Sequence, residues 1–542
     1  MNRLINKFNK NLRSNSIRNK KSKVPGEEKK KVSQKLPNNL WLTSSKDNNI
    51  RVVVGLDFGT TYSGFAYCHV NENQNICSND SWHGEVGQLK TNTVLQYDNE
   101  YKNVKFWGAP ALAKKQSRRT KTQNSSEGNK PVELFKLHLG DLLDKFKPKL
   151  PVDYKKAITD YLREIGKVIQ ETVATHWPKI DYFANVLLVI TVPAELSEKS
   201  KAIMRICAFD AGLIKEKYST NLQFTTEPEA AAVYCMENLK GQTFTRPGNN
   251  FMIVDCGGGT VDLTIRKLIN DKQLGEITER TGDFCGSTFI DKEFIKYLRK
   301  ILGDEPIDLL RDNNYGQMQY LIQQFCKYDN IQETCSAMFL VGGFSESKYL
   351  QKKINEKFNR RVETISVPTQ PMAAIARGAT IYGLSIKSDD LNNLDIDDNM
   401  KCVISSRVLK YSYGVEVSRE WENGDPIHRM TNDKRILKFD CLARRGTKMN
   451  INQEVTSSYV PLYPNQKNMA MKIYYTREYD GIYCDDPGMK HLGTLIADLP
   501  GSGLDRSILF GMTFGKMEII ATSKDEQTGK NYKATFTINL DD

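Results

Sequence analysis

The sequence has no apolar run long enough to cross a membrane as a helix. The longest candidate, Val186–Val192, has the length of a strand, whereas a spanning helix needs about 20 apolar residues. Hydrophobic residues make up 39% of the 542 residues and charged residues 26%, which is typical of globular proteins. We therefore expect no membrane span, and a chain of this length should form two to four domains.

The sequence also lacks the patterns of a metal centre or a disulfide framework. Its 11 cysteines are odd in number and form no Cys-x-x-Cys pair, and its six histidines show no metal-ligand spacing. Such usage is typical of reduced thiols in an intracellular protein. It argues against a zinc site.

Outside one terminal segment the sequence has almost no excess of positive charge. The formal net charge is +12, but Met1–Lys35 alone carries twelve lysines and arginines against two glutamates. The remainder is close to neutral, so a nucleic-acid partner is not expected. We interpret residues 1–50 as a disordered basic extension. A cytoplasmic location is favoured; a mitochondrial transit peptide is the alternative, because no acid precedes Glu27.

The secondary-structure pattern changes along the chain. We expect an α/β domain over residues 51–388, an acidic linker over 389–400 and an all-β domain over 401–542. Strands are indicated in the first domain at Arg51–Asp57, Phe65–Val70, Val186–Val192 and Ala337–Val341, with a further strand beginning at Phe251; helices are indicated at Val152–Trp177 and after Ser197; strands of the last domain are indicated at Met469–Tyr475, Lys516–Thr522 and Lys533–Asn539.

A strand followed by an acid, a glycine turn and a hydroxyl occurs twice. The first copy is Val54-Gly-Leu-Asp57-Phe-Gly59-Thr60-Thr61-Tyr62, and the second is Ile253-Val-Asp255-Cys-Gly257-Gly258-Gly259-Thr260-Val-Asp262. Glycines let backbone amides approach an anion closely. One such loop is weak evidence, because Asp and Gly are ordinary turn residues. Two copies indicate a duplicated fold whose loops face each other.

This arrangement suits a nucleoside triphosphate with Mg²⁺. Amides of the two opposed loops can hold the phosphates, while the carboxylates hold the metal through water and orient an attacking water. A third turn, at Gly342-Gly343 after the strand Ala337–Val341, permits close approach to the nucleoside.

Five motifs in order resemble the 70-kDa heat-shock protein family, and within it the divergent twelfth subfamily. They are Gly55–Tyr62, Ile190–Ala194, Thr226–Ala232, Asp255–Asp262 and Val341–Ser345, and the resemblance extends from about Val52 to Leu540. It implies a duplicated actin-like, ribonuclease H-like ATPase fold followed by a β-sandwich that binds extended polypeptide clients. It also implies ATP or ADP and Mg²⁺ as cofactors, with co-chaperones or nucleotide-exchange factors as further partners.

The resemblance implies a role for each matching residue. Asp57 and Asp255 would place the Mg²⁺ shell, Thr60 and Thr61 would contact phosphate, and Thr260 would position the γ-phosphate. Glu227 and Asp262 would polarise the water network, and Lys136 in Phe135-Lys-Leu137 matches the catalytic lysine. A surface lysine on an amphipathic helix is the alternative for Lys136. The cofactor-binding set is completed by Gly59, Tyr62, Gly257, Gly258, Gly259, Gly286, Gly342 and Gly343.

The chain departs from the family in three places. The interval Gly286–Gly342 is much shorter than the family's upper lobe over adenine, and Glu346 or Ser347 stands where the family has an arginine. We therefore expect the phosphate half of the site to be intact and the adenine half to be degenerate. The stretch 389–400 is acidic where the resemblance implies an apolar linker, and we expect no helical lid after the β-domain of residues 401–542.

Three functions fit these features. The leading hypothesis is an ATP-binding, slowly hydrolysing chaperone-like protein that would be a weak Mg²⁺-dependent ATPase. A small-molecule kinase on the same scaffold is disfavoured by the all-β domain. A non-hydrolysing nucleotide-binding scaffold or sensor is the remaining alternative, because of the shortened interval.

Overall fold

The computed structural model describes residues 50–72, 75–112, 130–140, 147–194, 196–238, 247–258, 261–270, 273–277, 281–283, 299, 337–359, 362, 364–390, 404–451, 453–514 and 517–535. Asp389 and Asp390, predicted to begin the linker over 389–400, belong instead to the helix Ala374–Asp390. Residues 1–49 of the extension predicted over 1–50, and residues 391–400 of the linker, lie outside the described ranges. So do most of the interval between Gly286 and Gly342 and the end of the strand expected at Lys533–Asn539. In the described part no helix is long and apolar enough to cross a membrane.

The first mixed sheet has the order β11-β10-β1-β2-β3, with β6 paired to β2. Strands β1 and β2 form an antiparallel hairpin, in which Asp57 pairs with Gly64, and β10 and β11 run parallel to β1. The sheet consists of β1 (Val52–Asp57), β2 (Tyr62–His69), β3 (Cys77–Ser78), β6 (Thr91–Asn92), β10 (Val186–Val192) and β11 (Leu222–Thr226).

The second mixed sheet repeats this arrangement in the order β17-β16-β12-β13-β14, then continues into β18 and β21, with β15 on β13. Here β12 and β13 form the antiparallel hairpin and β16 and β17 are the parallel strands. Its strands are β12 (Asn250–Cys256), β13 (Val261–Asn270), β14 (Gln273–Glu276), β15 (Thr281–Asp283), β16 (Ala337–Val341), β17 (Thr364–Ser366), β18 (Ile404–Val408) and β21 (Lys448–Asn450).

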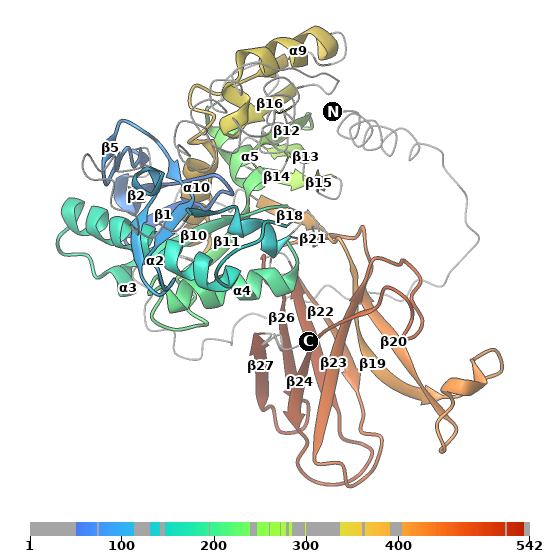
Figure 1. Ribbon diagram of the computed structural model, residues 1–542. Coiled ribbons are helices and arrows are strands. Elements are labelled where there is room, and N and C mark those ends of the chain that lie inside the picture. Colours follow the sequence, from blue (N-terminus) through green and yellow to red (C-terminus); the bar gives the residue numbers. More distant parts are fainter. Residues whose placement is uncertain are drawn as a thin grey trace.

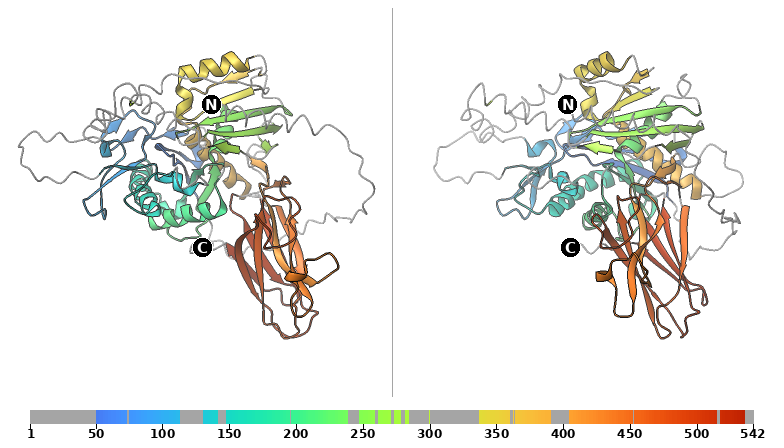
Figure 2. Two further views of the ribbon diagram at one scale, coloured as in Figure 1. Left: turned by 45° about the vertical axis from the view of Figure 1, so that its right-hand side comes forward. Right: turned by 90° about the vertical axis from the view of Figure 1, so that its right-hand side faces the viewer.

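Two helices, α5 (Glu227–Asn238) and α10 (Ala374–Asp390), lie between the sheets (Figures 1 and 2). Helix α10 packs on β1 and β10, α5 packs on β12 and β13, and the helices pack on each other. A side-chain carbon at Gly378 would lie 1.8 Å from the carbonyl oxygen of Ala230, so only glycine permits this approach. Both sheets are therefore fixed to one helix pair and share its hydrophobic core.

The outer face of the first sheet is covered by α2 (Tyr154–His176) and α4 (Glu198–Asp210). Each begins where the sequence supplies a cap: Asp153 accepts hydrogen bonds from the amides of Lys155 and Lys156, and Ser197 accepts one from Ser200. Other short elements are α3 (Tyr182–Asn185), η1 (Val70–Glu72), η2 (Ala109–Ala111), η3 (Phe135–Leu139), β4 (Ser81–Trp82), β5 (Glu85–Val86), β7 (Val94–Tyr97), β8 (Val104–Trp107) and β9 (Val132–Glu133). On the second sheet lie η5 (Gly343–Glu346) and α9 (Lys348–Phe358).

The C-terminal part forms two four-stranded antiparallel sheets around one apolar core. Strand β23 alternates buried and exposed residues, and Met469, Met471 and Ile473 point into that core. These three side chains therefore belong to the core and do not line an exposed groove. The strands are β19 (Ser412–Glu420), β20 (Arg435–Ala443), β23 (Asn468–Thr476) and β24 (Lys490–Asp498) in one sheet, and β22 (Gln453–Tyr459), β25 (Ile508–Phe514), β26 (Ile520–Asp525) and β27 (Asn531–Thr535) in the other, with η7 (Ile427–Arg429) between β19 and β20.

The strand predicted at Lys516–Thr522 begins only at Ile520. Two residues of the predicted strand, Met517 and Glu518, instead contact helix α4: Lys201 donates to the carbonyl oxygen of Met517 at 2.5 Å, and Arg205 pairs with Glu518 at 2.6 Å. These residues do not join the strand, and they contact the α/β part of the chain instead. Lys410 donates to the carbonyl oxygen of Ala194 at 2.8 Å as a further contact.

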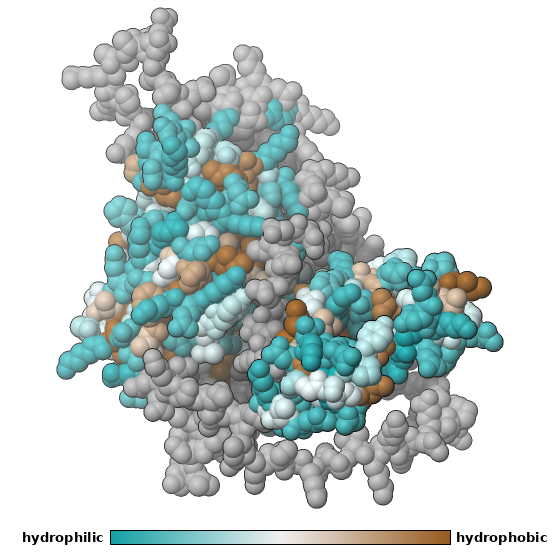
Figure 3. All heavy atoms as spheres, turned by 90° about the horizontal axis from the view of Figure 1, so that it is seen from below, coloured by the Kyte–Doolittle hydropathy of each residue, from teal (hydrophilic) through white to brown (hydrophobic). Residues whose placement is uncertain are grey.

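The outer surface of the C-terminal sheets shows no large apolar patch on the face seen in Figure 3. Hydrophilic residues dominate there and apolar residues are scattered among them. Single exposed apolar side chains are ordinary on soluble surfaces and need no partner. The most exposed are Val86, Ile427, Val460, Tyr479 and Ile496.

Candidate functional site

The first loop follows β1 and places Asp57 at its end. The carboxylate of Asp57 is buried, and its Oδ1 accepts a 3.4 Å hydrogen bond from Thr191 on β10. The amide of Gly59 donates to Ser63 Oγ at 3.2 Å, and a side-chain carbon at Gly59 would lie 2.1 Å from the carbonyl oxygen of Tyr62. The turn at Gly59 therefore excludes every larger residue, while Thr60 and Thr61 remain half-buried at its surface.

The second loop brings its glycines against the first. A side-chain carbon at Gly258 would lie 2.1 Å from Thr61 Oγ1, so the loops that follow β1 and β12 touch. Asp255 on β12 stands opposite Asp262 on β13 in the antiparallel register, and both are buried. Gly257 lies beside them. The predicted residues Gly259 and Thr260, and Gly286, lie outside the described residues.

The third loop completes the contact. Gly342 adopts a φ of 84°, and a side-chain carbon there would lie 2.3 Å from Asp255 Oδ1 and 2.6 Å from the carbonyl oxygen of Cys256. Gly343 follows as the first residue of η5. The loops carrying Thr61, Gly258 and Gly342 thus meet at one place, which we call the three-loop site.

Lys136 and Glu227 meet beside this site although 91 residues separate them. Lys136 lies on η3 and Glu227 is the first residue of α5; their Nζ and Oε1 atoms are 2.6 Å apart, with side chains 4% and 9% exposed. Lys136 also donates to the carbonyl oxygen of Phe58. The alternative of a surface lysine does not fit this burial.

The motifs did not reveal Lys90, which reaches the same site. Its Nζ lies 2.5 Å from Asp57 Oδ2, and the side chains are 8% and 2% exposed. The lysine precedes β6, whose pairing with β2 brings it to the loop. A side-chain carbon at Gly64 would lie 2.8 Å from Lys90 Cγ, so the missing side chain of Gly64 makes room for the lysine stem.

Electrostatics distinguish the two aspartates. Burial raises the pKa of Asp255 well above its usual range, and the nearby carboxylates of Glu227, Asp262 and Asp57 raise it further, while Lys90 opposes them. For Lys90, burial favours the neutral form, but Asp57, Asp255 and Glu227 outweigh it and raise the pKa. The surrounding acids therefore favour the charged ammonium of Lys90, whereas burial and the neighbouring carboxylates disfavour the ionised form of Asp255 in the empty site.

These residues fit a hydrated divalent cation. Asp255 Oδ1 is buried and accepts no hydrogen bond from the described residues. Among the described residues no three His, Cys, Asp or Glu side chains are placed to hold a metal ion directly. Mg²⁺ commonly keeps several waters and takes only one or two carboxylates, so a carboxylate oxygen that lacks a donor suits it.

Element η5, which begins at Gly343, ends in an acid, Glu346, next to the turn that is expected to border the nucleoside. Burial raises the pKa of Glu346, while the charges of Lys90 and Lys348 lower it. An acid therefore stands at the position where the resemblance implies an arginine.

A second acid of the Thr226–Ala232 motif, Glu229, is buried away from the loops in an ion-pair network. Arg407 on β18 donates to its Oε1 at 2.8 Å and its Oε2 at 3.0 Å. Arg266 on β13 lies 3.3 Å from both Glu229 and Glu276. Sequence reasoning missed this network because its members come from α5, β13, β14 and β18.

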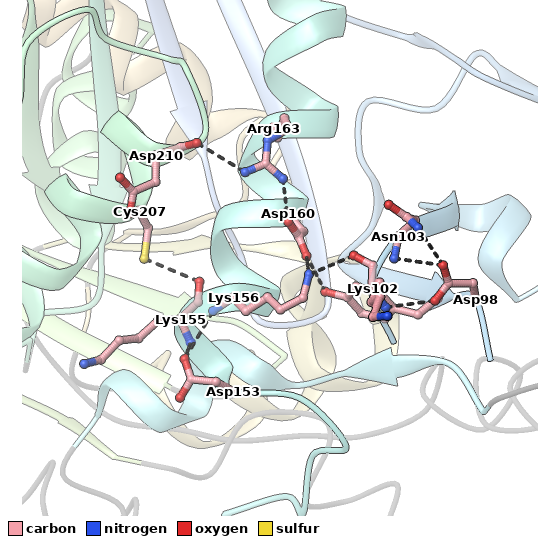
Figure 4. Close-up of polar contacts among 11 residues, drawn as sticks. Asp98, Lys102, Asn103, Asp153, Lys155, Lys156, Asp160, Arg163, Cys207 and Asp210 are labelled. Atoms are coloured by element: carbon pink, nitrogen blue, oxygen red, sulfur yellow. Dashed lines mark hydrogen bonds and ion pairs between the residues drawn. The ribbon is translucent and has the colours of Figure 1, made fainter. Parts of the chain in front are cut away.

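Another polar cluster lies between α2 and α4 and lines a cavity of about 290 Å³ (Figure 4). Its centre, Asp160, accepts hydrogen bonds from Tyr97 at 2.9 Å, Lys156 at 2.5 Å and Arg163 at 2.5 Å. A buried carboxylate with three donors is satisfied by the protein itself. We therefore interpret this cluster as structural.

Known proteins resemble the chain over most of its length. It is 25% identical over 647 aligned positions to heat shock 70 kDa protein 12A of Mus musculus, covering 90% of this chain and 92% of that protein. It is 22% identical to heat shock 70 kDa protein 12B of Homo sapiens, covering 90% of each. A segment comprising 24% of the chain is 32% identical to a chaperone protein HscA homolog of Acinetobacter baumannii, covering 19% of it. No family model matches the chain.

Proposed function

The chain belongs to the 70-kDa heat-shock protein family, as a relative of heat shock 70 kDa proteins 12A and 12B, and we propose that it binds ATP or ADP with Mg²⁺ at the three-loop site. The observation that carries this proposal is the contact of loops from both mixed sheets, with Gly258 against Thr61 and Gly342 against Asp255. At each contact a glycine lets two segments approach without a side chain between them, and close approach of this kind is also what binding of a phosphate chain requires.

We assign the binding roles by position. Thr60, Thr61 and the backbone of Gly257 and Gly258 hold phosphate oxygens, with Gly59, Tyr62, Gly259 and Gly286 as further members of the binding set, and Gly342-Gly343 borders the nucleoside. Asp57 and Asp255 order the water shell of the metal. The bound metal supplies charge neutralisation of the phosphates.

Slow hydrolysis of ATP is the second part of the proposal. Lys136 and Glu227 form a buried pair at 2.6 Å, so the ammonium can stabilise charge on phosphate while the carboxylate orients water. Asp262, opposite Asp255, joins that water network, and Thr260 positions the terminal phosphate. The protein would then be a weak Mg²⁺-dependent ATPase.

We further propose a duplicated actin-like fold followed by a β-sandwich that holds polypeptide clients, with co-chaperones or exchange factors as partners. The equal strand order of the two mixed sheets and the common core of the C-terminal sheets support this. The contacts of Lys201 and Arg205 with Met517 and Glu518 offer a route from one part to the other.

A nucleotide-binding scaffold or sensor that does not hydrolyse ATP is the second candidate. It is favoured by Glu346 near the site and by the length of the alignment, whose 647 positions exceed the 542 residues of this chain. The relative thus carries residues that this chain lacks, as a shortened lobe over adenine would require.

Calorimetry on the full chain with Mg²⁺-ATP tests the proposal. Asp57→Asn and Asp255→Asn should each weaken binding by about tenfold or more, since each removes a charge that orders the metal's waters. Lys102→Met, at an exposed lysine paired with Glu100, is the control and should bind like wild type. Wild-type affinity in both aspartate variants would refute the site.

Turnover separates the two candidates. Lys136→Met and Glu227→Gln should slow hydrolysis by about 100-fold or more while binding changes only a few-fold, because these groups act on the transition state. A wild-type rate equal to buffer would exclude the ATPase and favour the scaffold.

A further inference from the structure

The ammonium of Lys90 stands against Asp57, one of the two carboxylates proposed to order the metal's water shell. Among the described residues its one acceptor is Asp57 Oδ2, at 2.5 Å, and the pair is almost fully buried. Lys136, by contrast, is held by Glu227 and by the carbonyl oxygen of Phe58. An ammonium has three donors, so Lys90 keeps two for other acceptors.

The charge of Lys90 reaches both sheets. The carboxylates of Asp57, Asp255 and Glu227 raise the pKa of Lys90, and its ammonium in turn lowers the pKa of Asp255 and of Glu346. The stem is fixed where it passes Gly64, while the end of a lysine side chain is flexible. Lys90 can therefore change partners within the three-loop site without any change of the backbone.

We propose that Lys90 is an internal counter-ion that makes binding of the divalent metal conditional on the nucleotide. This inference rests on the nucleotide function proposed above. In the empty site the ammonium neutralises Asp57 and repels a bare divalent cation. A triphosphate offers the ammonium stronger acceptors, so Asp57 becomes available to the waters of the metal that arrives with it.

The physical basis is competition between two cations for one carboxylate. In a buried site the repulsion between an ammonium and a divalent ion a few ångströms away amounts to several kcal/mol even with an effective dielectric constant of about 20. Removing the ammonium should thus favour the bare metal. Loss of the ammonium should also weaken the attraction for a metal-free triphosphate. The affinity for the bare metal should therefore rise while the affinity for the metal-free triphosphate falls.

Titration of the full chain with Mn²⁺ alone, with ATP in EDTA, and with Mn²⁺ plus ATP tests this. Lys90→Met should bind Mn²⁺ alone about tenfold or more tightly than wild type, and metal-free ATP about tenfold or more weakly. The enhancement of Mn²⁺ affinity by ATP should shrink accordingly. Electron paramagnetic resonance of free Mn²⁺ and calorimetry of ATP provide the two readouts.

Three variants control the experiment. Lys90→Arg keeps the charge and should retain the wild-type enhancement, and Lys102→Met changes the net charge equally at an exposed site and should have no effect. Lys90→Met combined with Asp57→Asn should lose the gain in Mn²⁺ affinity. Should Lys90→Met fail to fold, Lys90→Gln, which keeps a donor toward Asp57, takes its place with the same expected signs.

The outcomes are distinct. If wild type binds no Mn²⁺-ATP, the proposed function is wrong. If wild type binds Mn²⁺-ATP but neither neutral variant gains affinity for Mn²⁺ alone, the inference about Lys90 is wrong and the proposed function stands.

Discussion

Asp57 and Asp255 hold equivalent positions in two sheets of the same strand order, yet their surroundings differ. Asp57 has a lysine at 2.5 Å and a threonine donor, whereas one oxygen of Asp255 accepts no hydrogen bond from any residue that the structure describes, and acids surround it. A repeated backbone topology therefore fixes where a carboxylate stands but not its charge state. That state depends on residues such as Lys90, which come from outside the repeated elements.

The largest expected effect is a difference in unfolding free energy between the Asp57→Asn and Asp255→Asn variants. Asp57→Asn should cost about 3–5 kcal/mol of unfolding free energy, because it leaves a buried ammonium without its carboxylate. Asp255→Asn should be neutral or stabilise by roughly 1 kcal/mol, since it removes a charge that burial disfavours. Urea unfolding of the full chain measures both. Equal losses in the two variants would break the comparison.

The next effect is a pH dependence confined to Asp255. Its folded-state pKa is raised above an unfolded value of about 3.9. Its contribution to stability is thus fully present below that value and is lost as the pH rises through the folded pKa. Asp255→Asn, which cannot ionise, should gain stability relative to wild type from pH 5 to pH 8. Melting temperatures at both values provide the test, and a constant difference would contradict it.

The smallest effect tests what neutralises Asp57. The hydrogen bond from Thr191 is 3.4 Å long, so Thr191→Val should cost less than about 1 kcal/mol, far less than loss of the lysine partner. Thr191→Ser keeps the hydroxyl and should match wild type. A loss as large as that of Asp57→Asn would show that the threonine, rather than Lys90, holds the carboxylate.

The sequence was sufficient to predict elements whose signal is local. Strands at Val186–Val192 and Ala337–Val341 have the predicted bounds, because an unbroken apolar run between turn residues needs no distant information. Asp57, Asp255 and Glu227 were predicted as site residues from motifs, and the structure places them at or beside the three-loop site; their roles remain predictions.

What could not be predicted depends on distant pairing. Lys90 reaches Asp57 through the contact of β6 with β2, and no spacing rule relates the two residues. On β23 the alternation predicts two faces, but only the facing sheet decides that Met469 and Met471 are inside. At Met517 and Glu518 the partners Lys201 and Arg205 lie more than 300 residues earlier, at separations of 316 and 313.

The strand β18 has a consequence for synthesis of the protein. It pairs with the edge of β14, and its Arg407 forms an ion pair with Glu229, which lies 178 residues earlier in the sequence. Before β18 and β21 are synthesised, the edge of the second sheet is unpaired and Glu229 lacks Arg407. We therefore expect the second sheet to complete its folding only after both strands have been made. A fragment that ends before Ile404 would carry both defects permanently.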